Sequence, residues 1–311
     1  MIISASRRTD IPAFHAPWFM NRIRAGFVLV PNPFNPKQIR RVSLAPGDVS
    51  GLVFWTRNPE PLLTGLDELD RRGFPYYFLF TITGLPRILE KNTLPPDRAA
   101  EIFRRLSTRL GPGRVVWRFD PVIITDVSPP GAILENFTVL AERLSGSTDR
   151  VIFSFAEIYR KVKKNLDRLE REEGVRCRDL AASPGEMTDL AGKLAEVAAA
   201  RGLRLQACCP QVDLTPAGLV PGKCVDPALL PGLTPEDFPR DKTQRPGCNC
   251  VASADIGQYD SCLHGCVYCY AVKNPEAALA NRKRHDPDSP FMLGKPEDYP
   301  ATPDPVQGRL F

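Results

Sequence analysis

The chain has 311 residues, of which 43% are hydrophobic, so it is long enough to bury a large core in one big domain or two smaller ones. Its 41 basic and 36 acidic residues nearly cancel, and the formal charge of +5 is a weak indication of an anionic partner. The chain has neither the roughly 18 apolar residues in a row that a membrane span needs nor a signal-peptide core after its start, so we expect a soluble, cytoplasmic protein.

Six short apolar runs, rich in β-branched or aromatic residues, are typical of buried strands. They are MIISA (1–5), GLVFWT (51–56), YYFLFTIT (76–83), RVVWRF (114–119), RVIFSFAEI (150–158) and RLQACC (204–209). Amphipathic segments predict helices between them at 17–26, 96–111, 131–146 and 185–202. Buried strands that alternate with helices indicate an α/β fold with a parallel sheet of βα units, either open or curled into a partial or full TIM-like barrel.

The last third of the chain is loop-rich and carries every cysteine except Cys177. In a cytosolic protein this clustering favours metal binding over a disulfide framework. The segment 274–285 predicts a last helix. We assign residues 1–285, with the Cys-rich segment 208–271, to a single domain and residues 286–311 to a Pro-rich tail.

The stretch CLHGCVYC places Cys262, Cys266 and Cys269 on one short loop. A closed zinc site needs a fourth ligand. His264 would have to turn inward together with both of its neighbours to supply one. A 4Fe–4S cluster held by three cysteines instead leaves one iron open to an outside ligand, so the motif predicts a catalytic cluster. Tyr268, just before the last cysteine, would lie beside the open position.

The C-x3-C-x2-C spacing, with an aromatic residue before the last cysteine, resembles the radical S-adenosylmethionine enzymes. The resemblance implies that the open iron binds the amino and carboxylate groups of S-adenosylmethionine. It also implies a reductant such as flavodoxin or ferredoxin, whose electron cleaves the cofactor to methionine and a 5′-deoxyadenosyl radical that abstracts hydrogen from a substrate. The fold of these enzymes is a full or partial βα barrel.

In these enzymes the cysteine loop normally follows the first strand, whereas here it follows most of the βα units. A circular permutation explains this order, with ASADIGQY (252–259) as the strand before the loop, 274–285 as the helix after it and MIISA as the second strand. The combination of ISASRRTDIPAFH (3–15), WRFDPVI (117–123), QRPGCNC (244–250) and DIGQYDSCLHGCVYCYA (255–271) resembles the DUF1848 family with its permuted radical S-adenosylmethionine domain. A more distant similarity is to spore photoproduct lyase-like radical enzymes.

Polar residues stand at the ends of several predicted strands, which meet at one edge of a parallel sheet. After the first strand, Thr9 and Asp10 either cap the next helix or bind the cofactor's amino group. Arg118 either forms a buried ion pair with Asp120 or holds the cofactor. We predict cofactor contacts from Tyr268, Thr9, Asp10 and Arg118. Three further polar residues end strands in the same way: Arg57, Asn58 and Glu157.

The remaining cysteines form a second group, with Cys208 and Cys209 at a strand end, Cys224 in a loop and Cys248 and Cys250 in a C-N-C motif. One of the first pair, for which we take Cys209, makes four thiolates with the other three. Four thiolates suffice for a second iron–sulfur cluster or a zinc site. The cluster is slightly favoured because it would relay electrons, and the alternative is that these cysteines pack as small hydrophobic residues.

The sequence thus predicts a radical S-adenosylmethionine enzyme of unknown substrate. One alternative is a non-catalytic zinc or iron–sulfur binding protein. Another is a radical enzyme that repairs or modifies nucleic acid, which the basic charge and the lyase-like motif favour. The chain lacks the aromatic-plus-basic stretches expected of a strand-binding groove.

Overall fold

The computed structural model describes residues 1–245 and 247–299. Eight strands form one sheet in the order β11-β10-β8-β6-β5-β4-β1-β12, and each neighbouring pair is parallel. These strands are β1 (Ile2–Ala5), β4 (Gly51–Thr56), β5 (Tyr76–Thr81), β6 (Val115–Val122), β8 (Arg150–Phe155), β10 (Arg204–Ala207), β11 (Val220–Pro221) and β12 (Ala254–Asp255). All six predicted strands are therefore present, and the predicted parallel α/β fold is confirmed.

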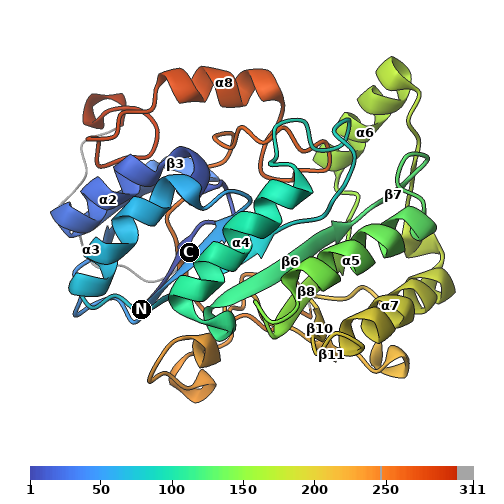
Figure 1. The fold of residues 1–311 in the computed structure, drawn as a ribbon. Coiled ribbons are helices and arrows are strands. Elements are labelled where there is room, and N and C mark those ends of the chain that lie inside the picture. The colour runs from blue at the N-terminus through green and yellow to red at the C-terminus, as the bar shows by residue number, and fades with distance from the viewer. Residues whose placement is uncertain (246, 300–311) are drawn as a thin grey trace.

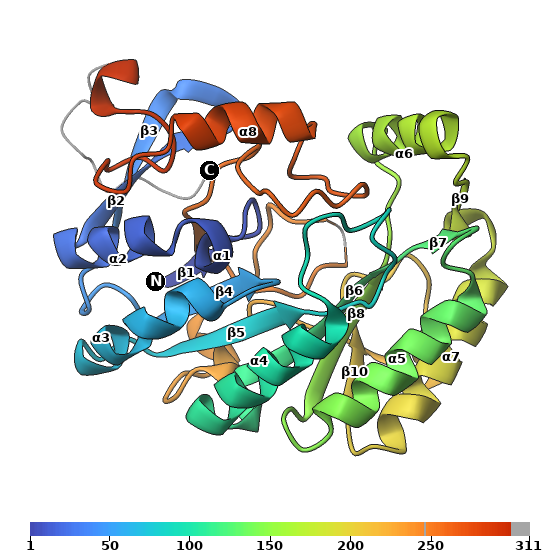
Figure 2. The same cartoon turned by 45° about the horizontal axis from the view of Figure 1, so that its top comes forward.

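Helices separate most of the strands along the chain. The helices are α1 (Ile11–Phe14), α2 (Ala16–Ala25), α3 (Leu66–Arg71), α4 (Pro96–Leu110), α5 (Pro130–Leu144), α6 (Arg160–Glu173), α7 (Pro184–Ala199) and α8 (Pro275–Lys283). Figures 1 and 2 show α3, α4, α5 and α7 in a row along one face of the sheet. No helix in the described part of the chain is both long and apolar enough to cross a membrane.

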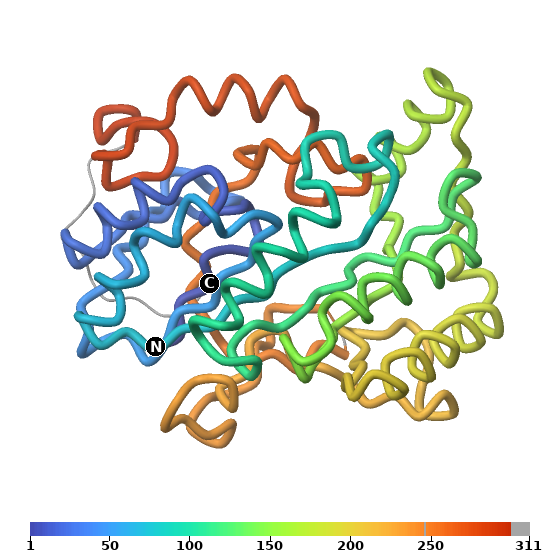
Figure 3. Tube along the Cα trace, viewed as in Figure 1, coloured from blue at the N-terminus to red at the C-terminus, as the bar shows by residue number. Residues whose placement is uncertain are grey.

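The two edges of the sheet define how far it curls. In the described residues no hydrogen-bonded pair joins β11 to β12, so the sheet is open and corresponds to a partial barrel. At one edge, Ile3 of β1 pairs with Ala254 and Ser4 pairs with Asp255, while β4 flanks β1 on the other side. The trace in Figure 3 shows this late segment beside the N-terminal strand. The strand before the cysteine loop therefore precedes MIISA in space, as the permuted order predicts.

Alternate residues of the strands face two different layers, because successive side chains of a strand point to opposite sides of the sheet. Phe54, Phe78 and Trp117 pack in the main core beneath the helices. Val53 and Tyr77 face the other way and pack against buried residues of the Cys-rich segment. This segment therefore covers the face of the sheet that a closed barrel would enclose.

An antiparallel hairpin, not predicted from the sequence, joins α2 to β4. Its strands are β2 (Phe27–Asn32) and β3 (Asn35–Ser43), and a second small pair is made by β7 (Ile124–Thr125) and β9 (Cys177–Arg178). Most of β3 is exposed and polar, so it lacks the apolar pattern by which buried strands are identified.

The first part of the predicted Pro-rich tail packs against α2. Phe291 and Met292 are buried, and the indole N–H of Trp18 donates to the carbonyl oxygens of Ser289 (3.1 Å) and Phe291 (3.0 Å). Residues 300–311 of the tail lie outside the described residues.

His15 is fully buried where α1 ends and α2 begins. Its Nε2 lies 3.3 Å from the carbonyl oxygen of Ser261, and its ring meets the edge of His285 at a centroid distance of 4.5 Å. Burial, with a smaller contribution from the positive charge of His285, lowers the pKa of His15 to about 3. The imidazole is therefore neutral in the folded protein at neutral pH.

We expect His15 to make folding sensitive to acid. An unfolded histidine titrates near pH 6.5, above the folded pKa, so its stabilising effect is complete above that pH and is lost as the pH falls towards 3. Between pH 7 and pH 5 the loss amounts to about 2 kcal/mol of unfolding free energy. Urea denaturation of wild type and His15→Asn at both pH values tests this. A stability difference between the two proteins that does not change with pH would contradict it.

Candidate functional site

A cavity of about 650 Å³ lies at the carboxyl ends of the parallel strands. Its walls include Thr9 after β1, Arg57 after β4, Arg118 in β6 and Cys208 after β10. In α/β folds this edge of the sheet is where ligands bind. Both cysteine groups line the cavity.

The first group is the three-cysteine loop, formed by Cys262, Cys266 and Cys269. The connection between β5 and α4 holds this loop by backbone hydrogen bonds. Val267 N–H donates to the Leu89 carbonyl at 3.0 Å, and Asn92 N–H donates to the His264 carbonyl at 2.9 Å. The three thiols are therefore carried by a loop whose backbone is fixed against a second segment.

His264 is engaged by Asp10. Its Nε2 lies 2.7 Å from Asp10 Oδ2, and its ring packs on Phe14 at a centroid distance of 4.7 Å. Asp10 also accepts the backbone N–H groups of Arg57 (2.7 Å) and Ala13 (3.0 Å), so it caps α1 and ties the cysteine loop to the ends of two strands. The contact occupies Nε2, while Nδ1 of His264 is buried without a hydrogen-bond partner in the described structure.

A buried polar network lies beside the loop. Arg57 Nη2 is 2.6 Å from Tyr268 Oη and 3.0 Å from Glu90 Oε1, and the Tyr268 hydroxyl donates to Glu90. Thr83 Oγ1 donates to the same carboxylate at 2.7 Å. Burial alone would lower the pKa of Arg57, but Glu90, Tyr268 and Cys266 raise it well above its usual value. Glu90 was not among the predicted site residues.

The raised pKa values of the loop thiols keep them protonated at neutral pH. Burial raises the pKa of all three, that of Cys266 to about 12 despite the opposing charge of Arg57. Among the residues that the structure describes, no three His, Cys, Asp or Glu side chains surround a point that would hold a single metal ion. An iron–sulfur cubane does not require this, because each cysteine binds a different iron.

All four predicted cofactor contacts line the cavity: Tyr268, Thr9, Asp10 and Arg118. The polar atoms of Asp10 and Tyr268 are used within the protein, as described above. Thr9 Oγ1 is buried and has no hydrogen-bond partner in the described structure. Arg118 forms the ion pair with Asp120 that the strand alternation suggests, and its Nε is buried without a partner among the described residues.

The second cysteine group lines the same cavity through Cys208, Cys224, Cys248 and Cys250. Cys208 Sγ lies 3.4 Å from Cys224 Sγ. Cys209, the residue chosen from the sequence, is buried in one cluster with Cys224, Cys248 and Cys250 but does not line the cavity, and the backbone there has a φ of 49°. The pKa of Cys250 is lowered because the thiols of Cys224 and Cys248 hydrogen-bond to it. Cys250 is therefore the thiol of this group that most readily loses its proton.

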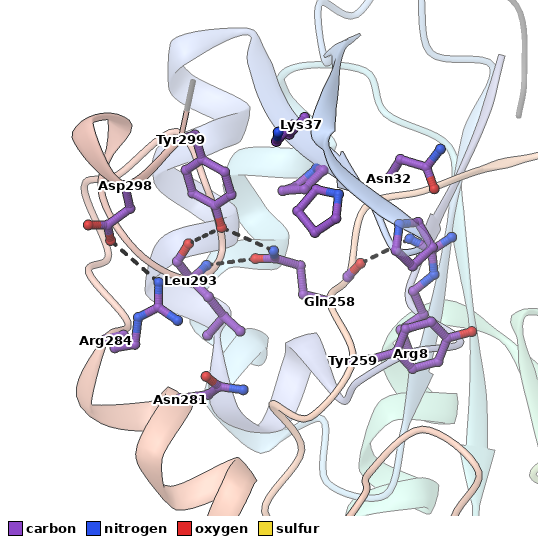
Figure 4. A pocket seen from close by; sticks show the side chains of 14 residues that line it. Arg8, Asn32, Lys37, Gln258, Tyr259, Asn281, Arg284, Leu293, Asp298 and Tyr299 are labelled. Atoms are coloured by element: carbon purple, nitrogen blue, oxygen red, sulfur yellow. Dashed lines mark hydrogen bonds and ion pairs between the residues drawn. The ribbon is translucent and has the colours of Figure 1, made fainter. Parts of the chain in front are cut away.

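A second cavity, of about 480 Å³, opens between the β2–β3 hairpin and the C-terminal segment (Figure 4). Several of its polar groups are paired within the protein. Tyr299 Oη donates to the Leu293 carbonyl at 2.7 Å, Gln258 Oε1 accepts the Leu293 N–H at 2.8 Å, and Arg284 lies 3.5 Å from Asp298.

Asp255 and Gly257 fix the turn that carries Thr9. Asp255 accepts hydrogen bonds from the hydroxyls of Ser4 (3.0 Å) and Ser6 (2.7 Å) and from the Arg7 N–H (2.8 Å). A Cβ at position 257 would lie 2.0 Å from Ser6 Oγ, so only glycine fits there without a shift.

We expect Gly257→Ala to push the Ser6 turn away from β12 and to lower the unfolding free energy by about 1–3 kcal/mol. Gly131→Ala is the matched control, because a Cβ at position 131 meets nothing within 4 Å. Urea denaturation of both variants is the measurement. If Gly257→Ala has the same unfolding free energy as Gly131→Ala, the turn accommodates the added methyl group without loss of stability.

A family model described as a domain of unknown function, DUF1848, matches residues 2–271. The matched range runs from β1 to just beyond the three-cysteine loop and includes both cysteine groups. No curated protein and no solved structure matches the chain.

Proposed function

The chain belongs to the DUF1848 family, and on that premise we propose that it is a radical S-adenosylmethionine enzyme whose 4Fe–4S cluster is bound by Cys262, Cys266 and Cys269. The observation that carries the proposal is that three thiols of one loop line a cavity at the carboxyl ends of a parallel sheet. His264, which lies between the first two cysteines, has its Nε2 engaged by Asp10, and we assign no cluster ligand to it. Three ligands leave one iron of a cubane open, as this chemistry needs.

The residues around the loop fit such a cofactor. When bound, the cluster supplies the electron that cleaves S-adenosylmethionine to methionine and a 5′-deoxyadenosyl radical. The unpartnered Thr9 Oγ1 offers a hydrogen-bond partner on the cavity wall, and we assign it to the cofactor's amino group. A buried hydroxyl without a partner costs stability, which a bound polar group would offset.

The other predicted contacts act on the loop rather than on the cofactor. Asp10 holds His264 and the backbone of Arg57, so it sets where the cysteine loop meets β1 and β4. Tyr268 is anchored by Arg57 and Glu90, which fixes the residue between the second and third cysteine ligands. We therefore assign Asp10 and Tyr268 as positioning residues, and Arg118 is considered with the second cysteine group below.

Anaerobic reconstitution with iron and sulfide tests the cluster. We expect about four iron atoms per chain to depend on the three loop cysteines, and an electron paramagnetic resonance signal of the reduced cluster that changes when S-adenosylmethionine is added. The change is expected only if one iron is open to the cofactor. If the signal of the reduced cluster is the same with and without S-adenosylmethionine, the proposal is refuted. Uptake of zinc without iron at this loop would favour a non-catalytic metal protein.

A further inference from the structure

Four thiols of the Cys-rich segment are linked by a chain of contacts. Cys208 touches Cys224 at 3.4 Å, and Cys250 lies within hydrogen-bonding reach of the thiols of both Cys224 and Cys248. The backbone N–H of Val225 donates to Cys250 Sγ at 3.3 Å. Backbone N–H groups that donate to cysteine sulfur are typical supports of metal–thiolate sites.

Two buried arginines face these thiols. Burial lowers the pKa of both groups. The charges of Cys250 and Asp255 raise the pKa of Arg7, and those of Asp120, Cys224 and Cys208 raise the pKa of Arg118. Both guanidinium groups lie over the ring of Trp55, at 5.3 and 4.9 Å from its centroid. Arg7 Nη2 and Arg118 Nε have no hydrogen-bond partner in the described structure. Arg7 lies 3.8 Å from Asp241 Oδ2 and Arg118 is paired with Asp120, so each cation has one carboxylate partner. A negatively charged thiolate centre would add a second counter-charge beside these buried cations.

We propose that Cys208, Cys224, Cys248 and Cys250 bind one zinc ion in a closed tetrahedral site whose negative charge is partly offset by Arg7 and Arg118. Four thiolates around a divalent ion leave two negative charges, which Arg7 and Arg118 offset only in part because Asp241 and Asp120 already pair with them. This site does not depend on the proposed radical chemistry. It takes Cys208 as the fourth thiolate, in place of the Cys209 chosen in the sequence analysis.

The sulfur spacing favours zinc over the second iron–sulfur cluster that the sequence analysis prefers. Zn–S bonds of about 2.3 Å in a tetrahedron put neighbouring sulfurs about 3.8 Å apart, close to the Cys208–Cys224 separation of 3.4 Å. In a cubane each thiolate binds a different iron, so the sulfurs stand farther apart. The four thiols form an open chain of contacts and do not yet surround one point, so side-chain rotation must bring the ends of the chain together.

The site would hold the loop-rich layer on the sheet. Tyr77 of β5 already anchors this layer, since its hydroxyl donates to the Cys224 carbonyl at 2.6 Å and accepts the Asp226 N–H at 3.0 Å. Because the layer lacks long helices or strands, a metal that joins residues 208, 224 and 248–250 would supply the order that regular structure supplies elsewhere.

The test uses the full chain with Cys262, Cys266 and Cys269 all replaced by alanine, so that its outcome is independent of the first cluster. We expect about one zinc per chain by mass spectrometry and four sulfur neighbours at about 2.3 Å by X-ray absorption at the zinc edge. In the same background, Cys224→Ser is expected to lower the zinc content at least about tenfold, while Cys177→Ser and Cys209→Ser keep it. Iron and sulfide in place of zinc, no metal at all, or loss of zinc in Cys209→Ser but not in Cys208→Ser would overturn the assignment.

A variant that keeps all nine cysteines tests the charge balance and guards against a Cys224→Ser protein that does not fold. Arg7→Met is expected to weaken zinc binding about 10- to 100-fold in competition with a chelator. Arg8→Met is the matched control, because Arg8 points to the Gly257 carbonyl and the ring of Tyr259. Equal zinc affinity of the two variants would show that Arg7 does not offset the negative charge of the site. Failure of the radical chemistry in the wild-type protein would leave the zinc result unchanged.

Discussion

Replacement of Cys266 by alanine is expected to abolish retention of the iron–sulfur cluster and all reductive cleavage of S-adenosylmethionine. Cys266 is the central thiol of the loop, paired through its backbone with Glu90 and lining the cavity. With two thiolates left, two irons of the cubane lack a protein ligand. Cys262→Ala and Cys269→Ala are expected to behave alike. The measurements are iron and sulfide content after anaerobic reconstitution and 5′-deoxyadenosine by chromatography.

Cys177→Ala is the matched control for the loop variants. Cys177 lies in β9, is half-buried and belongs to neither cysteine group. We expect wild-type iron content and wild-type cofactor cleavage from this variant. Cleavage that survives in any one of the three loop variants, or that disappears equally in Cys177→Ala, would contradict the assignment of the loop.

Glu90→Gln is expected to lower the unfolding free energy by about 3–5 kcal/mol, because it leaves the Arg57 guanidinium buried without its counter-charge. The side chains of Glu90 and Arg57 are only 4% and 12% exposed, so solvent cannot replace the lost interaction. The amide oxygen of glutamine can still accept from the Tyr268 and Thr83 hydroxyls, so the change removes mainly the charge that faces Arg57. Urea denaturation gives the loss of stability, and the cluster content of the variant reports whether the loop has moved.

Two variants make the Glu90 result interpretable. Glu101→Gln breaks an ion pair with Arg98 on the exposed face of α4 and is expected to change stability little. Adding Arg57→Met to Glu90→Gln removes the uncompensated charge and is expected to restore part of the lost stability. If the double variant is less stable than Glu90→Gln by the whole loss that Arg57→Met causes alone, the two residues do not act as a pair.

The sheet was predictable because its strands are buried on both faces. GLVFWT and YYFLFT are continuous apolar runs, and each packs one set of side chains under the helices and the other under the Cys-rich layer. The permuted order followed from the position of the cysteine loop, and the β1–β12 pairing agrees with it. The hairpin at Phe27–Ser43 was not predictable in this way, since its strands are held by pairing with each other and β3 is mostly exposed.

The parts of the site that the sequence did not reveal depend on contacts between distant segments. Glu90 stands in a loop without a motif, and its role arises from contacts with Arg57 and Tyr268, the latter 178 residues away. The choice between Cys208 and Cys209 depends on which neighbour faces Cys224, and spacing alone cannot decide it. Cys209 has a positive φ of 49°, so the backbone turns between the two cysteines and their side chains point in different directions.

Formation of 5′-deoxyadenosine tests the central claim most directly. Reconstituted wild-type protein is incubated anaerobically with S-adenosylmethionine and dithionite, beside Cys266→Ala and Cys177→Ala. The account predicts 5′-deoxyadenosine from wild type and Cys177→Ala and none from Cys266→Ala. Protein that carries a complete cluster at the three-cysteine loop and yields no 5′-deoxyadenosine with any reductant, or that yields it equally without Cys266, would contradict the account.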